Sequence, residues 1–143
     1  MKGFVFEKQQ RAYLRHTAAA ADSIYGDSFE IRDGAVAGIG NNVTLTWEDM
    51  DFGGEKEVSL EIEGRTDLEI NTVTIRIRNE QGEETAGIAD FDGQGGTTQR
   101  FDMRVPEGRC SVSFVFLPGS SFDFIGFRFS ERLYRQKKEN KIK

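Results

Sequence analysis

Cysteine, histidine and proline are scarce in this sequence, whose 143 residues include one Cys, one His and two Pro. The single Cys110 excludes an internal disulfide framework, and its apolar surroundings indicate a buried, inert thiol. His16 has no Cys or His neighbour at metal-binding spacing, so a zinc site and a histidine-based triad are both disfavoured. No apolar run reaches the ~20 residues of a membrane span. No leading segment resembles a secretion signal, which predicts a cytoplasmic location.

Charge is distributed unevenly along the chain, although the net charge is only −5. Residues 16–130 hold nine Lys/Arg against 21 Asp/Glu, whereas residues 131–143 hold six Lys/Arg against two Glu. An acidic body disfavours nucleic-acid binding, which requires a basic face. We interpret the basic end as a solvated terminus that contacts neither nucleic acid nor membrane. The predicted organisation is one domain over residues 1–129 and a basic C-terminal tail over residues 130–143.

Short runs of alternating apolar and polar residues fill most of the chain, with 16 Gly and 12 Phe among and between them. Alternation is strict in residues 43–47, 58–63, 73–78 and 101–105, and Asp33-Gly34 is typical of a hairpin turn. This pattern predicts an all-β fold, an antiparallel β-sandwich or jelly roll. The exception is residues 7–15, which are rich in helix formers.

The run Ser121–Phe129 contains four phenylalanines around one aspartate. In a regular strand Phe122 and Phe124 would lie in one phase and Phe127 and Phe129 in the other. Such a strand must be covered on both faces. Asp123, embedded in it, then needs a metal ion or a positive side chain as partner, since an unpaired buried charge is prohibitive.

No catalytic constellation emerges from the sequence. Asp90-Phe91-Asp92-Gly93 begins like a calcium loop but lacks the later acidic positions, which indicates an exposed turn. The many carboxylates show no spacing that selects a pair for glycoside hydrolysis. The sequence therefore predicts a domain that is not itself an enzyme.

Several motifs together resemble the C-terminal accessory domain of bacterial family-two glycoside hydrolases of the β-galactosidase type. That domain is similar in plan to family-six carbohydrate-binding modules. The motifs are Ala21-Asp22-Ser23-Ile24-Tyr25-Gly26-Asp27-Ser28-Phe29, Gly38-Ile39-Gly40-Asn41-Asn42-Val43, Met50-Asp51-Phe52-Gly53, Gly64-Arg65-Thr66, Asn71-Thr72 and Leu117-Pro118-Gly119-Ser120-Ser121-Phe122-Asp123-Phe124.

The resemblance implies a galactose-binding-like jelly roll with a structural calcium ion. Asp22 matches one calcium-ligand position, with Asp in place of the usual Glu, and Asp123 matches the other. The resemblance also implies that residues 16–22 pair as a first strand, against the helical preference of the alanines around them.

The resemblance further implies a sugar cleft with an aromatic sandwich and an asparagine before the last strand. The cleft-tyrosine position corresponds to Leu45 and the asparagine position to Ser121, and Trp47 is interpreted as a core residue. The candidate sugar-binding residues are polar and lie beside turns, where asparagine is often structural. They are Asn41, Asn42, Arg65 and Asn71.

Two functions follow from these observations. The first is a non-catalytic, carbohydrate-binding-like accessory domain of a β-galactosidase-type glycoside hydrolase, with the parent's catalytic domains as partners and a galactoside or plant polysaccharide as ligand. The alternative is a purely structural domain, without sugar binding, that packs on the catalytic body or forms a homodimer.

Overall fold

The computed structural model describes residues 11–132, which fold almost entirely into β-strands. Two 3-10 turns, η1 (Arg11–Tyr13) and η2 (Ala18–Ala20), flank the first strand. The strands are β1 (Arg15–Thr17), β2 (Ser23–Arg32), β3 (Ala35–Asp51), β4 (Glu57–Thr66), β5 (Ile70–Asn79), β6 (Glu84–Asp92), β7 (Thr98–Arg104), β8 (Arg109–Phe116) and β9 (Phe122–Glu131). No described helix is long and apolar enough to span a membrane.

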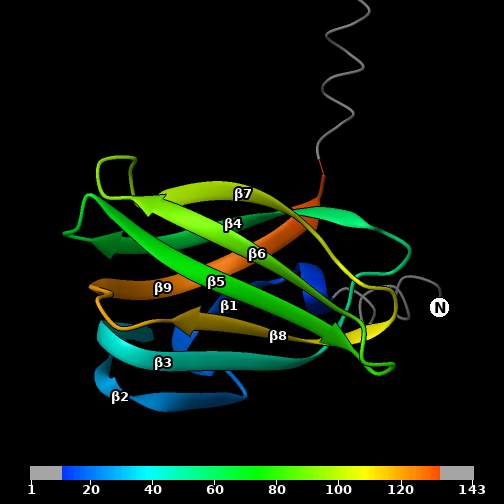
Figure 1. Cartoon of the computed structure of the whole chain (residues 1–143), viewed down its shortest axis with the longest axis horizontal. Helices are drawn as coiled ribbons and strands as arrows, with labels where there is room; N and C mark the ends of the chain where they lie inside the picture. The colour runs from blue at the N-terminus through cyan, green and yellow to red at the C-terminus, as the bar shows by residue number, and fades with distance from the viewer. Residues whose placement is uncertain (1–10, 133–143) are drawn as a thin grey trace, which may run out of the picture.

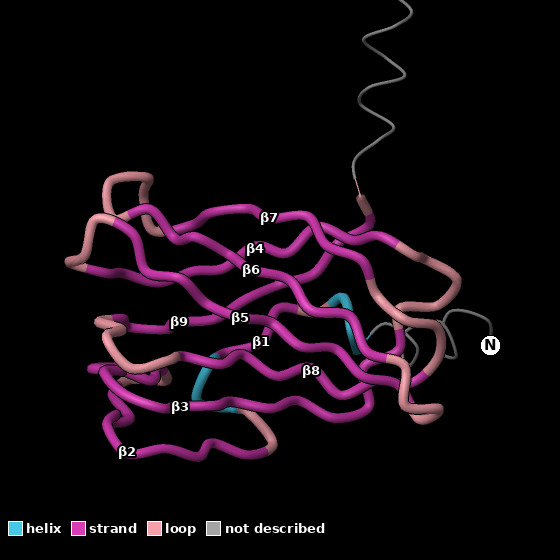
Figure 2. Tube along the Cα trace, viewed as in Figure 1, coloured by secondary structure: helices cyan, strands magenta, loops and turns pink. Residues whose placement is uncertain are grey.

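The strands form two layers of antiparallel sheet, shown in Figures 1 and 2. One layer has the order β6-β5-β8-β3-β2, and the other contains β7, β4, β9 and β1. The first half of β3 also pairs with β9, so hydrogen bonding runs from one layer into the other. The predicted antiparallel β-sandwich is therefore confirmed.

Strand β3 crosses between the layers and positions much of the rest of the molecule. Its residues 36–39 pair with β9, and its residues 43–51 pair with β8. The backbone bends at Gly38 (φ 63°), within the part that pairs with β9, and at Asn42 (φ 47°), just before the part that pairs with β8, both in the left-handed region. Glycine and asparagine are the residues that adopt this conformation most readily. The bend brings the first half of β3 beside the start of β9.

The space between the layers is filled with aromatic rings. Trp47 is 1 % exposed and contacts Phe127 edge-on, with ring centroids 4.6 Å apart. Phe114 and Phe124 lie on its other sides, at 5.6 and 6.4 Å. Edge-to-face pairs of this kind add about 0.5–1.5 kcal/mol each beyond the burial of their area. The expectation that Trp47 belongs to the core is confirmed.

The aromatic residues of β9 all face this core, which corrects the prediction of a strand apolar on both faces. Phe122 and Phe124 point inward, and a bulge around Ile125 and Gly126 then shifts the phase by one residue. After the bulge, Phe127 and Phe129 point inward as well. A β-bulge adds one residue to one strand and re-aims the side chains beyond it. The outer face of β9 therefore does not need a second apolar cover.

The beginning of the described chain also differs from its helical preference. Residues 11–13 form one 3-10 turn, and Arg15–Thr17 pairs with Gly126–Arg128 as β1. The first strand implied by the resemblance is thus present but shorter, because Ala18–Ala20 turns again. The hairpin at Asp33-Gly34 is confirmed, with φ of 53° and 82°. Residues 1–10 and most of the predicted basic tail, from 133, lie outside the described residues.

Candidate functional site

A pocket of about 520 Å³ opens at one end of the sandwich, where β3 begins to bend, β4 ends and β9 begins. We call it the Arg65 pocket. Three neighbouring segments supply most of its wall, and the loop between β6 and β7 closes one side. Its lining residues are Gly38, Arg65, Thr66, Asp67, Gly93, Ser121, Phe122 and Asp123.

Asp123 and Arg65 face this pocket from paired positions of β9 and β4. One oxygen of the Asp123 carboxylate, Oδ1, accepts a 2.8 Å hydrogen bond from the backbone N–H of Gly38. The Arg65 guanidinium is exposed and forms no hydrogen bond or ion pair with residues 11–132. Asp123 is only partly buried, and its partner among the described residues is a backbone N–H rather than a positive side chain. The nearby guanidinium of Arg65 keeps its donors available.

The loop after β4 is held against the residue that precedes β9. Thr66 Oγ1 donates to the carbonyl of Ser121 at 2.6 Å and accepts from the backbone N–H of Leu68 at 3.1 Å. The Ser121 hydroxyl in turn donates to Asp67 Oδ1 at 2.6 Å. These bonds fix the position of the Asp67 carboxylate at the pocket rim, while its other oxygen has no partner among the described residues.

The arrangement suits a ligand rich in hydroxyl groups. Asp67 and Asp123 each keep one carboxylate oxygen unbonded by the described chain, and Arg65 offers several N–H donors. Hydrogen bonds to charged groups are roughly twice as strong as those between neutral groups. No lining residue presents an exposed aromatic face, because the only lining ring, Phe122, is 2 % exposed.

Of the four predicted sugar-binding residues, only Arg65 lines this pocket. Asn71 is 1 % exposed, and its Oδ1 accepts a 2.8 Å hydrogen bond from the backbone N–H of Ser121. Asn71 therefore holds the backbone of the lining residue Ser121 and does not line the pocket itself. Asn41 and Asn42 are exposed on β3 but are not among the lining residues. The structure does not bring the four residues together.

The residue at the position of the cleft tyrosine does not reach the pocket. Leu45 is fully buried and contributes to the core, so it cannot line a cleft. Gly38 is the residue of β3 that reaches the pocket. Asp67 was missed by sequence reasoning, since it is an ordinary acid in a turn. The only available signal was its position one residue after the Gly64-Arg65-Thr66 motif.

The two predicted calcium ligands lie near different parts of β3. Asp22 accepts a 2.7 Å hydrogen bond from the backbone N–H of Glu48, whereas Asp123 is bonded to Gly38. Glu48 and Gly38 are ten positions apart on β3, so these two hydrogen bonds hold the carboxylates at different places along the strand. Within residues 11–132 no group of three or more His, Cys, Asp or Glu is arranged to hold a metal. Calcium binding itself stays a prediction.

A second pocket, of about 460 Å³, lies at the other end of β9. It is lined by Tyr13, Leu14, Phe52, Arg128 and neighbouring residues, and we call it the Tyr13 pocket. The Tyr13 hydroxyl donates to the carbonyl of Phe52 at 2.7 Å, and burial raises the pKa of this tyrosine. Its ring meets that of Phe52 edge-on at 5.8 Å. Leu14, 52 % exposed, gives this pocket an apolar rim.

Comparison with solved structures places the fold among family 6 carbohydrate-binding modules. One match is the C-terminal module of LamC, a laminarinase from Zobellia galactanivorans, with a TM-score of 0.68 and 15 % identity over 82 % of this chain and 98 % of that one. Another is a module from Clostridium stercorarium in complex with cellobiose, with a TM-score of 0.59 and 23 % identity over 85 % and 95 %.

A third match lies within a larger enzyme. It is a family 43 arabinoxylan arabinofuranohydrolase from Bacillus subtilis in complex with cellotetraose, with a TM-score of 0.60 and 22 % identity. The match covers 85 % of this chain but only 28 % of that one. No family model matches the chain, and no curated protein matches it. The TM-scores of these matches show the shared β-sandwich fold.

Proposed function

We propose that this chain is a non-catalytic carbohydrate-binding module that holds a sugar in the Arg65 pocket. The observation that carries the proposal is the set of unbonded polar groups there. A guanidinium to which no residue in the range 11–132 is bonded and two carboxylates, each anchored through one oxygen, converge on one concavity. A concave site with a few convergent polar groups is the usual form of a small-ligand site. The fold of the solved modules supports the same function.

The sugar is held by its hydroxyl groups rather than by stacking. Leu45, at the position of the cleft tyrosine, is buried in the core, and Ser121 stands at the position of the asparagine, so the pocket lacks the aromatic and amide surfaces that the resemblance implies. The carboxylates of Asp67 and Asp123 accept hydrogen bonds from hydroxyls, and Arg65 donates to ring or hydroxyl oxygens. A ligand without stacking is expected to bind weakly and to depend strongly on the orientation of each hydroxyl.

The ligand is a neutral sugar. The pocket contributes one positive and two negative side chains, within a body of nine Lys/Arg and 21 Asp/Glu over residues 16–130. A uronic acid would meet net repulsion from this field, although Arg65 alone would attract it. A neutral galactoside or plant polysaccharide meets no such repulsion.

The module belongs to a larger glycoside hydrolase. A domain with this fold occupies about a quarter of the chain of the arabinofuranohydrolase, which supports attachment to a catalytic domain. The finer assignment, to a β-galactosidase-type parent of family two, is supported by the motifs of the sequence. The coding sequence that surrounds this chain tests that assignment, because an in-frame hydrolase of another family would contradict it.

The test of binding is an NMR titration of the ¹⁵N-labelled chain with galactose, xylose, cellobiose and galacturonic acid. We expect a neutral sugar to shift the amide signals of Gly38, Gly93 and Ser121, and galacturonic acid to shift them less at the same concentration. No shift with any of the four sugars would overturn the proposal.

Matched variants separate the pocket from the rest of the surface. Arg65→Ala and Asp67→Asn should each weaken binding about tenfold, the loss of one charged hydrogen-bond partner. Arg104→Ala removes the same charge as Arg65→Ala but from β7, outside the pocket, and should leave affinity unchanged. Equal losses in all three variants would indicate a general effect of charge or stability.

The alternative, a structural domain that packs on the catalytic body, is favoured by a different observation. The Tyr13 pocket has the exposed Leu14 at its rim and lies beside the two ends of the described chain. Sugar-induced shifts are not expected there. Shifts at Gly53 and Gly54 on addition of the parent's catalytic domain, with none at Gly38 on addition of sugar, would support the structural role instead.

A further inference from the structure

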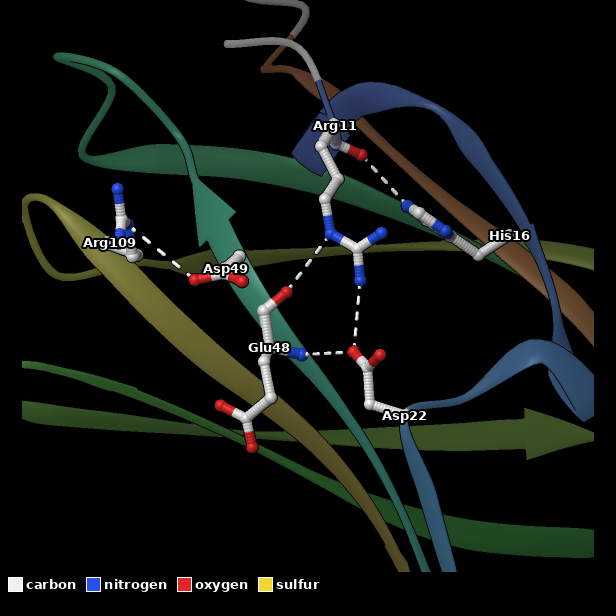
Figure 3. Close-up of polar contacts among 6 residues, drawn as sticks. All are labelled: Arg11, His16, Asp22, Glu48, Asp49 and Arg109. Atoms are coloured by element: carbon white, nitrogen blue, oxygen red, sulfur yellow. Dashed lines mark hydrogen bonds and ion pairs between the residues drawn. The ribbon is translucent and has the colours of Figure 1, made fainter. Parts of the chain in front are cut away.

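Arg11 bridges two oxygen atoms that belong to distant parts of the chain. Its Nη2 lies 3.0 Å from Asp22 Oδ2, and its Nε donates to the carbonyl oxygen of Glu48 at 3.1 Å. Figure 3 shows the guanidinium between these two groups. A carboxylate oxygen and a backbone carbonyl oxygen are also the types of ligand that calcium uses in proteins. The guanidinium thus occupies a position where the resemblance to family-six modules implies a metal ion.

We infer that Arg11 is a built-in cation that replaces calcium at Asp22. In this arrangement the positive charge needed to hold Asp22 against β3 comes from the chain itself. The domain then needs no metal ion at this place to fasten its N-terminal segment.

The donors around Asp22 do not fit a metal ion. The Asp22 oxygen that meets Arg11 also accepts the backbone N–H of Glu48 at 2.7 Å. An N–H directed at this oxygen places a positive partial charge where a cation would have to approach. Calcium requires six to eight oxygen ligands, and no cluster of three potential ligand side chains exists within residues 11–132. The nearby Asp49 is turned toward Arg109, at 3.7 Å (Figure 3).

The contact fastens a segment that connects the two layers. His16 makes a 2.9 Å hydrogen bond from Nε2 to the carbonyl oxygen of Arg11, which fixes the turn that carries the guanidinium. Arg128 of β9 donates from Nε to the carbonyl oxygen of Tyr13 at 3.2 Å. Arg11 itself reaches the β3 residue Glu48 in the opposite layer. The segment from Arg11 to Thr17 therefore joins the end of β3 to β9, and the Arg11 contact is its attachment to β3.

Other ion pairs of the molecule provide a comparison. Arg100 contacts Glu61 across two neighbouring strands of one layer, and both side chains are 40–47 % exposed, as exposed as Arg11 and Asp22 at 39 and 47 %. Such surface pairs contribute little to stability. Arg11 differs because it contacts both Asp22 and a backbone carbonyl. A measurable loss of stability is expected on its removal, and a smaller one for Arg100.

The experiment measures thermal unfolding of the full chain in millimolar calcium chloride and in EDTA. It uses the wild type, Arg11→Ala, Asp22→Asn and the double variant. We expect the wild type to melt at the same temperature in both buffers. Each single substitution should lower the melting temperature by about 3 °C, and the double variant should lose no more than either single one. Asp22→Asn removes the charge but keeps a side-chain oxygen, which can still accept the hydrogen bond from the Glu48 N–H.

Arg100→Ala and Glu61→Gln are the matched control pair, with the same charge changes on one face of the other layer. These two substitutions should lower the melting temperature less than Arg11→Ala and Asp22→Asn do. A rise in melting temperature with calcium that Asp22→Asn abolishes would overturn the inference, as would additive losses in the double variant. A calcium-induced rise that persists in Asp22→Asn would place calcium elsewhere and would uphold the role of Arg11, provided that the losses are not additive.

Discussion

The Asn71 side chain holds Ser121 in place through a 2.8 Å hydrogen bond that its Oδ1 accepts from the Ser121 backbone N–H. Asn71 lies at the start of β5 and is 1 % exposed, so its side-chain oxygen cannot turn to water instead. Ser121 in turn orients Asp67 at the pocket rim. Asn71, which the sequence analysis assigned to sugar contact, therefore does not line the pocket. It positions Ser121, which does.

Replacing Asn71 with alanine should destabilise the domain by about 1–3 kcal/mol, because the partly buried Ser121 N–H loses its partner and the buried amide of Asn71 is replaced by a smaller side chain. Urea unfolding followed by circular dichroism measures the change. Asn41→Ala, at an exposed site, is the matched control and should remain within about 0.5 kcal/mol of the wild type. If the two substitutions have equal effects, Asn71 does not support the pocket in the way described.

Replacing Gly64 with alanine should prevent folding or cost more than about 3 kcal/mol. A Cβ at this position would lie 2.5 Å from Cζ of Phe122 and 2.6 Å from the carbonyl oxygen of Asp123. Both neighbours are fixed in β9, beside the bulge. Gly54→Ala is the control, since a Cβ there meets nothing within 4 Å. Soluble yield and the urea midpoint of the two variants check the prediction, and a well-folded Gly64→Ala protein would contradict the close approach of β4 and β9.

Most of the fold could be predicted because each strand carries a local signal. In β3, Val43, Leu45 and Trp47 alternate with polar residues, and all three are buried. The bulge in β9 gave no such signal. Ile125 and Gly126 fit a regular strand as well as a bulge, and only the pairing of Glu63 and Gly64 with β9 shows which is present. A one-residue shift reverses every later side chain.

The pocket was harder to predict than the fold, because its walls come from segments far apart in the sequence. Gly38, Arg65 and Ser121 are brought together only by the order of the strands. Polar residues beside turns were the correct type of candidate, and Arg65 was one of them. Asn71 has the same sequence character, but its place at the inner face of β5 buries it. Burial of this kind depends on strand register, which no single turn motif specifies.

His16 should make the domain less stable as the pH falls below about 6.5. Burial lowers the pKa of this histidine, while the nearby Arg11 charge lowers it further and Asp22 and the Arg11 carbonyl oppose the shift. The ring also lies against Phe127, with centroids 5.2 Å apart. Below the ordinary pKa of about 6.5 the unfolded chain binds a proton that the folded chain does not, which favours unfolding. The stability stops falling through this effect once the pH drops below the lowered pKa of His16 in the folded protein.

The comparison that isolates this effect uses His16→Phe, which keeps a ring against Phe127 and cannot titrate. Unfolding free energies of both proteins are measured from pH 7.5 to 5.5 (roughly the range in which histidine titrates). The advantage of the wild type over the variant should shrink as the pH falls, because the carboxylates are common to both proteins. A constant difference over this range would show that His16 has an ordinary pKa.

Cys110 should react very slowly with alkylating reagents in the folded protein. The thiol is 3 % exposed and lies 3.3 Å from the carbonyl oxygen of Gly108, to which it donates. Burial raises its pKa to about 11, with a smaller contribution from the charge of Asp51. At pH 8 only about one thiol in a thousand would then be the reactive thiolate. Both the low thiolate fraction and the burial slow the reaction.

Labelling with iodoacetamide at pH 8, followed by mass spectrometry, checks this prediction. Ser111→Cys is the matched control, because residue 111 belongs to the same strand but alternates to the partly exposed face. This variant should gain one rapidly labelled thiol while Cys110 stays unmodified. In urea both cysteines should react at similar rates, because the core around Cys110 no longer exists. The pairing of Cys110 with Met50 of β3 and Asn79 of β5 implies that these two strands protect the thiol. Rapid labelling of Cys110 in the wild type without denaturant would contradict this, because it would mean that the start of β8 opens frequently.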